Sequence, residues 1–146
     1  MLANVLKIAF CSLILCGTQT IVKAQDHIER VWYNQEKTSK IQVYKAKDGK
    51  FYGKIIWMKE PLRDGKPKLD IENPEEKNRT QPIMGMVILR GLQKDGDKEY
   101  ADGKIYDPKN GKTYSCKATL NGSQLDLRGY IGISLIGRTS TWTPAD

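Results

Sequence analysis

The sequence contains few of the residues on which most catalytic and metal sites depend. It has one histidine, His27, and three cysteines, of which only Cys116 lies beyond residue 24. Ser-His-Asp and Cys-His sites need a histidine held inside a cleft, and zinc sites need several histidine or cysteine ligands. The sequence therefore argues against these classes of internal site, and Cys116 alone forms no intramolecular disulfide. We expect no metal site and no cofactor.

A hydrophobic run long enough to cross a membrane as a helix is also missing. The most apolar stretch, Ile8 to Leu15, follows Lys7 and precedes Val22-Lys23-Ala24, and this order is typical of a secretory signal peptide. Phe10 and Leu15, which precede the two early cysteines, are too bulky for a lipoprotein signal. The sequence predicts a signal peptide over 1–24, one domain over 25–146, and a periplasmic or secreted product with no integral membrane segment.

Charge of one sign is not concentrated anywhere along the chain. The 24 lysines and arginines outnumber the 17 acidic residues, which gives a formal net charge of +7. Because the basic residues are spread over expected turns and outward strand positions, the pattern argues against a nucleic-acid partner. It indicates solubility and a loose attraction to anionic surfaces of the cell envelope. A protein partner is not specified by the sequence.

The remaining chain reads as strands separated by tight turns. Valine, isoleucine, tyrosine, tryptophan and threonine are enriched between breaks at Asp48-Gly49, Asp95-Gly96 and Asn121-Gly122, which are typical of hairpins. Eight consecutive antiparallel strands predict an all-β meander that closes into a barrel, with an open two-sheet sandwich as the alternative. The expected strands cover residues 29–34, 39–46, 51–58, 83–92, 98–106, 112–120, 123–130 and 138–143.

Residues 59–82 interrupt this rhythm between the third and fourth strands. Four of the six prolines fall in this segment, which predicts a long loop without a sheet strand. Within it, Asn73-Pro74 followed by Glu75-Glu76 is typical of a helix start, so we expect one or two helical turns there. A loop of this length in a compact domain is often functional, and we expect it to form a lid or rim.

Short motifs are spread over nearly all of the chain after residue 24. They are Val31-Trp32-Tyr33, Gly53-Lys54-Ile55, Gly103 through Pro108, Gly111 through Tyr114, Leu127 through Tyr130, and Gly137-Arg138-Thr139 with Trp142. These motifs resemble those of the DUF2147 family, whose members are exported bacterial proteins of undefined activity. The resemblance implies a bacterial protein of the periplasm or beyond, and it implies no activity.

A wider resemblance is to the calycins, the lipocalin-like and fatty-acid-binding barrels. These carry Gly-x-Trp on the first strand and a late arginine that packs across the indole at the closed end of the barrel. The resemblance assigns these barrel-closing roles to Trp32 and Arg138, although Arg30 stands in place of the glycine. An arginine over an indole gains a cation–π contact whatever the family.

Six side chains are candidates for ligand binding. Alternate residues of a barrel strand face inward, so aromatic residues on several strands are able to line a cup. Arg128 follows the alternating Leu125 and Leu127, and an inward guanidinium would capture a carboxylate or phosphate. The alternatives are ordinary strand composition for the aromatics and a solvent-facing Arg128 if the leucines form the core. The candidates are Trp57, Tyr100, Tyr106, Tyr114, Arg128 and Tyr130.

These observations favour an exported protein that binds a small amphipathic or anionic molecule without catalysis. A second hypothesis is a structural or protein-interaction module of the periplasm whose barrel is filled by side chains. A third is an enzyme that works without histidine, through groups such as Tyr106 with Asp102 and Asp107, although Asp107-Pro108 is also ordinary turn chemistry. The sequence assigns no catalytic residue.

Overall fold

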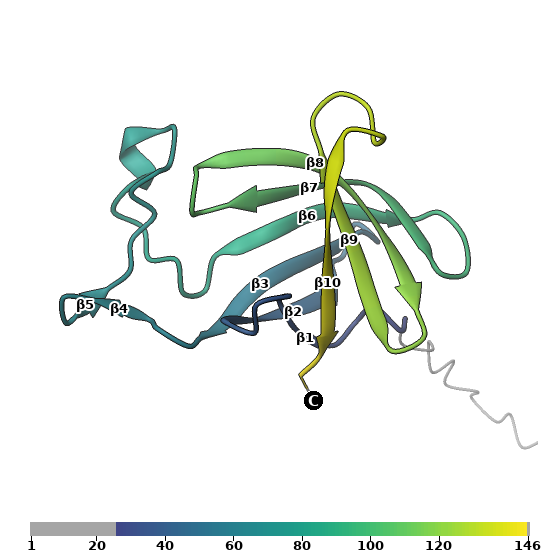
Figure 1. The fold of residues 1–146 in the computed structure, drawn as a ribbon, viewed down its shortest axis with the longest axis horizontal. Helices are drawn as coiled ribbons and strands as arrows, with labels where there is room; N and C mark the ends of the chain where they lie inside the picture. Colours follow the sequence, from purple (N-terminus) through teal and green to yellow (C-terminus); the bar gives the residue numbers. More distant parts are fainter. Residues whose placement is uncertain (1–25, 146) are drawn as a thin grey trace, which may run out of the picture.

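The computed structural model describes residues 26–145, and the predicted signal peptide lies outside the described residues. Eight strands form one closed antiparallel barrel in the order β1-β10-β9-β8-β7-β6-β3-β2 (Figure 1), as the sequence predicts. The strands are β1 (Val31–Tyr33), β2 (Ser39–Lys45), β3 (Phe51–Met58), β6 (Val87–Lys94), β7 (Glu99–Asp107), β8 (Lys112–Asn121), β9 (Gln124–Tyr130) and β10 (Gly137–Pro144).

The barrel closes where the first and last strands pair. Trp32 of β1 lies opposite Pro144 of β10, and Tyr33 lies opposite Thr143. Every strand of the barrel is therefore hydrogen-bonded on both sides, which removes the exposed edges that an open sandwich would keep. Within residues 26–145, no helix reaches the length and apolarity needed to span a bilayer.

The strand boundaries differ most from the prediction at β6, which begins at Val87 and not at Ile83. Gly85 has a φ of +84°, and the Met86 amide donates to the Ile83 carbonyl at 3.1 Å, so residues 83–86 form a turn. The apolar character of residues 83–92 indicated a strand from Ile83. The turn at the positive-φ Gly85 delays the start of β6 by four residues.

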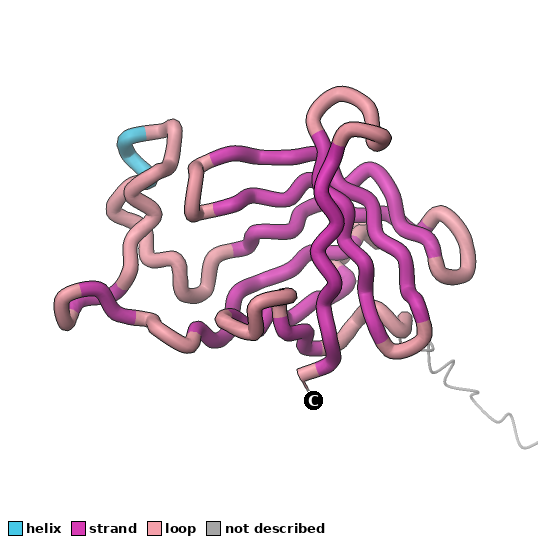
Figure 2. Tube along the Cα trace, in the orientation of Figure 1, coloured by secondary structure: helices cyan, strands magenta, loops and turns pink. Residues whose placement is uncertain are grey.

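The long loop contains more structure than expected. A small hairpin joins β4 (Leu62–Arg63) to β5 (Lys66–Pro67), so the prediction of a segment without strands is wrong there. Asp64 and Gly65 turn this hairpin with φ angles of +52° and +73°. In Figure 2 the hairpin and the short helical turn of this loop lie to one side of the barrel.

The expected helix is one 3-10 turn, η1 (Glu76–Asn78), and it begins after Glu75. Asn73 does not cap it as predicted. The Asn73 side-chain oxygen accepts a hydrogen bond from the Glu75 amide at 2.9 Å, which makes a local turn before the helix. Residues 59–82 are therefore folded, and we call them the lid below, after the role that the sequence predicts for them.

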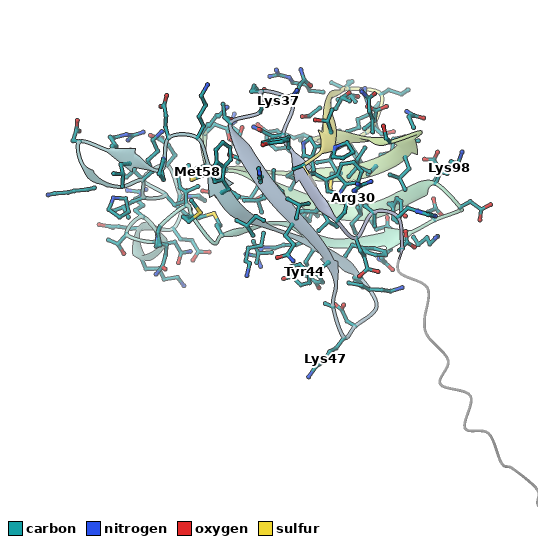
Figure 3. All side chains as sticks on the ribbon, turned by 90° about the horizontal axis from the view of Figure 1, so that it is seen from below. Arg30, Lys37, Tyr44, Lys47, Met58 and Lys98 are labelled. Atoms are coloured by element: carbon teal, nitrogen blue, oxygen red, sulfur yellow. The ribbon has the colours of Figure 1, made fainter. Side chains whose placement is uncertain are left out.

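The two ends of the barrel carry different connections. Residues 26–30 and the tight turns at 46–50, 95–98 and 122–123 close one end. The lid and the loops 34–38, 108–111 and 131–136 surround the other, which we call the open end. Figure 3 shows this polarity, with Met58 beside the lid and Lys98 at the opposite end of the molecule.

The core fills the closed end. Phe51 packs edge-on against Tyr100 with ring centroids 5.4 Å apart, and both side chains are buried. The indole N–H of Trp32 donates to the Ile28 carbonyl at 3.0 Å, so the N-terminal residues plug this end of the barrel. Other buried residues here include Leu92, Leu120 and Leu125.

Candidate functional site

The open end of the barrel leads into a cavity of about 1040 Å³. This volume lies at the upper end of the range usual for small-molecule sites, about 300–1000 Å³. Its walls are mainly aliphatic and aromatic side chains that project inward from six strands. They include Ile41, Ile55, Ile88, Ile105, Leu127 and Trp142.

Charged side chains surround the mouth of this cavity. Lys68 lies 3.6 Å from the carboxylate of Glu60, so part of the rim is internally neutralised. Arg138, in contrast, forms no salt bridge with any of residues 26–145. It lies opposite Gly129 in the β9–β10 ladder, on the cavity side, and its side chain is exposed at the rim. The mouth therefore carries charges of both signs, with Glu36, Glu72 and Asp107 among them, and Arg138 is a cation there that has no salt-bridge partner within the described chain.

The lid is fastened to the barrel through one buried carboxylate. The hydroxyl of Tyr106 on β7 donates to one oxygen of Asp70 at 2.7 Å, and the side-chain amide of Asn73 donates to the other oxygen at 2.7 Å. Asp70 is 1% exposed. Burial and the hydrogen bond to Asp70 raise the pKa of Tyr106 well above its usual range. Tyr106 therefore stays protonated at neutral pH and keeps the lid in place.

A second contact holds the lid against the turn between β7 and β8. A Cβ atom at Gly111 would lie 1.9 Å from the Glu72 carbonyl oxygen, and Gly111 has a φ of +69°. Only glycine fits this close approach of two backbones. Since Glu72, Lys109 and Asn110 all line the cavity, the contact sets the shape of the mouth.

Comparison with known proteins adds a family and a fold relative. Residues 31–144 match the family model DUF2147, described as an uncharacterized protein conserved in bacteria. The chain belongs to the DUF2147 family. A similar solved structure is described as protein HP1028 from the human pathogen Helicobacter pylori, which belongs to the lipocalin family; the two are 29% identical over 82% of this chain and 83% of that chain, with a TM-score of 0.71. No curated protein matches the sequence.

Three of the six predicted ligand-binding residues lie at the cavity of this DUF2147 protein. Tyr106, Tyr114 and Tyr130 all line it, from β7, β8 and β9. The hydroxyl of Tyr114 accepts a hydrogen bond from the Asn110 side chain at 3.1 Å, which orients the phenol at the rim. Of the three, only Tyr114 shares the inward face, since it pairs with the inward Ile105, whereas Tyr106 and Tyr130 pair with Thr113 and Ser115 on the opposite face and reach the cavity at its rim.

The other three predicted residues lie elsewhere. Trp57 is on the outer surface, edge-on to Tyr33 at 6.2 Å, because the register shift opposite Lys40 and Ile41 leaves Ile56 of β3 unpaired and so reverses the alternation of β3. Tyr100 is buried in the closed end. Arg128 faces outward because Leu125 and Leu127 fill the interior, which is the alternative that the leucine spacing left open.

The expected cation–π contact between Arg138 and Trp32 does not form. Arg138 is the second residue of β10, at the open end, whereas Trp32 lies opposite Pro144, six residues further along and about 20 Å away at the usual rise of a strand. The guanidinium over the indole belongs to Arg30, at 5.5 Å from the ring centroid. The residue that departs from the calycin pattern therefore supplies the cation–π contact.

Sequence reasoning missed the aliphatic walls and Asp70. Isoleucines such as Ile105 alternate along their strands as core residues do, and nothing in their spacing tells a cavity wall from a core. Asp70 lies among charged loop residues, and its burial follows only from the lid folding onto Tyr106. Among residues 26–145, no group of three histidines, cysteines or carboxylates is arranged to hold a metal ion.

Proposed function

We propose that this DUF2147 protein is an exported carrier that binds one small amphipathic anion in its barrel and releases it unchanged. The observation that carries the proposal is a large apolar cavity with an arginine at its mouth that has no acidic partner in the described chain. An open cavity supports this function over a filled barrel that serves only as a structural module.

The walls define the apolar part of the ligand. Isoleucines from β2, β3, β6 and β7 give a surface without strongly directional groups, which suits an alkyl chain or a flat hydrocarbon skeleton. Burying such a group releases about 25 cal/mol for each Å² of apolar surface that leaves water. The walls therefore provide affinity but little discrimination between apolar shapes.

The rim defines the polar part. Arg138 presents a planar guanidinium that binds a carboxylate or phosphate through two parallel hydrogen bonds. The phenol of Tyr114 is a further polar group of the cavity wall. A molecule with its tail in the barrel and its anionic head at the rim satisfies both parts.

The first experiment is mass spectrometry of the intact protein purified from its host under native conditions. We expect a retained molecule of small mass, with an ionisable head and an apolar remainder. In parallel, displacement of a fluorescent amphipathic probe measures the affinity of an acyl carboxylate and of the matching acyl alcohol. A protein that binds neither, and that carries nothing from its host, contradicts the proposal.

Two substitutions separate the head from the tail. Arg138→Gln is expected to weaken carboxylate binding about tenfold and to leave the alcohol unchanged, since one charge-assisted contact is lost. Arg90→Gln, on the outer face of β6, is the matched control. Gly129→Leu places a side chain in the cavity and should abolish binding of both molecules. If Gly129→Leu binds like the original protein, the ligand does not occupy the barrel.

Export is the other part of the proposal. A signal peptide over 1–24 supports a location in the periplasm or outside the cell. N-terminal sequencing of the protein from its host should read Gln25 first. A protein that begins at Met1 contradicts this part and leaves the cavity proposal intact.

A further inference from the structure

The loop between β9 and β10, residues 131–136, differs from the other loops at the open end. It contains no charged residue, whereas the loops 34–38, 59–86 and 108–111 all do. Four of its six residues have large aliphatic side chains, and these are 60–85% exposed. These side chains are Ile131, Ile133, Leu135 and Ile136. Figure 1 shows this loop projecting beyond the strands at the top of the view.

Three consecutive carbonyls at the tip of the loop, those of residues 133–135, accept local hydrogen bonds. The guanidinium of Arg128 donates to the Ser134 carbonyl at 2.6 Å and to the Leu135 carbonyl at 3.1 Å. The amide of Ile136 donates to the Ile133 carbonyl at 3.1 Å. Unpaired carbonyls are costly in a medium without water, so this pairing prepares the loop tip for an apolar environment.

Positive charge lies directly behind the apolar tip. Arg128 and Lys117 are opposite each other on the outer face of β9 and β8, and Arg138 stands at the base of the loop. Tyr130 precedes the loop, and tyrosine favours the boundary between water and lipid. The aliphatic side chains at the tip suit the acyl region of an anionic membrane. The tyrosine and the cations behind them suit its interface and its charged headgroups.

We infer that residues 131–136 dock the protein on an anionic lipid surface and that the ligand enters from there. Ile131 and Ile136 line the cavity as well as the loop. An alkyl chain is therefore able to pass from the lipid into the barrel over a continuous apolar surface, with its anionic head kept near Arg138. The entry route rests on the proposed function, whereas the docking contact does not.

A second copy of the chain fits the loop less well. Six residues bury on the order of a few hundred Å² on each copy, below the about 800 Å² per partner of stable protein interfaces. Facing loops would also bring Arg128 and Arg138 of the two copies together without acidic partners. A lipid surface accepts a small apolar tip and neutralises the cations behind it.

The test is flotation of the purified protein with vesicles of phosphatidylcholine alone and with added phosphatidylglycerol. We expect binding to the anionic vesicles that weakens with salt. The double variant Ile133→Ser/Leu135→Ser should lower this binding at least about tenfold. Neither residue lines the cavity, so the affinity for an acyl carboxylate in vesicle-free solution should not change. The matched control is Ile56→Ser/Leu62→Ser, two exposed aliphatic residues outside the loop.

The outcomes separate the two proposals. If the original protein binds the carboxylate in solution but never floats with anionic vesicles, the docking inference is overturned and the carrier function stands. If it floats through this loop but takes up no ligand, the docking contact stands and the carrier function fails. Light scattering checks the remaining alternative, because a dimer that the double variant dissociates, without vesicle binding, would make the loop an interface between copies.

Discussion

The two ends of this barrel are built from the same strands but use their inward positions differently. At the closed end, side chains from the strands and from residues 26–30 meet in a packed core around Phe51, Tyr100 and Trp32. At the open end, the inward side chains of the same strands leave space between them that stays open as the cavity. Stability is therefore concentrated at one end, and the other end is available for a ligand.

The space around the inward-facing glycines also differs between the two ends of the barrel. A Cβ at Gly103 would lie 2.8 Å from both the Cys116 sulfur and a Leu92 methyl, and one at Gly53 would lie 2.9 Å from the Leu89 Cβ. A Cβ at Gly129 would find its nearest neighbour at 3.6 Å, an ordinary contact distance. Glycine is thus required by packing in the walls near the core and is optional at the cavity.

The largest expected contrast is in thiol reactivity. Burial raises the pKa of the Cys116 thiol to about 12, so at pH 8 it is neither ionised nor accessible until the barrel opens. A thiol placed in the cavity by Ser140→Cys needs no such opening. In the chain that begins after Ala24, we expect Cys116 to react with a colorimetric disulfide reagent at least about a thousandfold more slowly than the new thiol.

The carboxylate ligand supplies the control for this experiment. Added ligand should protect the thiol of Ser140→Cys and leave the slow reaction of Cys116 unchanged. Comparable rates for the two thiols in the absence of ligand would mean that the closed end opens as readily as the mouth, and the contrast between the ends would be lost.

The barrel could be predicted because short turn motifs in the sequence determine its hairpins. Asp-Gly and Asn-Gly turns at 48–49, 95–96 and 121–122 fix hairpins, and eight hairpin-linked strands have few ways to satisfy their edges other than closure. The same signal at Asp64-Gly65 predicts the β4–β5 hairpin, but the surrounding prolines outweighed it. The β6 boundary needed the φ of Gly85, which the sequence does not give.

The cavity inside the barrel could not be predicted in the same way. Ile105 and Leu127 alternate along their strands as core residues do, and whether facing side chains meet depends on the barrel's diameter and on the lid. Arg128 and Arg138 show the same limit. Leucine alternation correctly allowed an outward Arg128, but the place of Arg138 at the cavity follows from a register with Gly129 that only the folded ladder defines.

Substitution of the inward glycines should sharpen the comparison. Gly103→Ala is expected to lower the free energy of unfolding by about 1–3 kcal/mol, because Leu92 and Cys116 must move to admit a methyl group. Gly129→Ala should change it by less than about 0.5 kcal/mol. Urea unfolding followed by tryptophan fluorescence measures both. Equal losses at the two sites would show that the cavity wall is as tightly packed as the core.

The smallest expected effect concerns the carboxylate that fastens residues 26–30 to the closed end. Asp26 accepts hydrogen bonds from Tyr100 and from Lys94, the latter at 2.7 Å. Burial alone would raise the pKa of Asp26, but these bonds outweigh it and hold the pKa below its usual range. Asp26→Asn should lower the free energy of unfolding at pH 7 by about 1–2 kcal/mol, since one charge-assisted contact is lost and Lys94 is partly exposed.

The lowered pKa of Asp26 also predicts how the free energy of unfolding depends on pH. Because the folded protein holds Asp26 ionised at a lower pH than the unfolded chain does, the carboxylate stabilises the fold above about pH 5. That stabilisation is lost as the pH falls through the depressed pKa. The gap in urea midpoint between the original protein and Asp26→Asn should therefore be widest near neutral pH and narrow toward pH 2. A gap that stays constant would mean that Asp26 acts through its shape and not its charge, and that the closed end is held by packing alone.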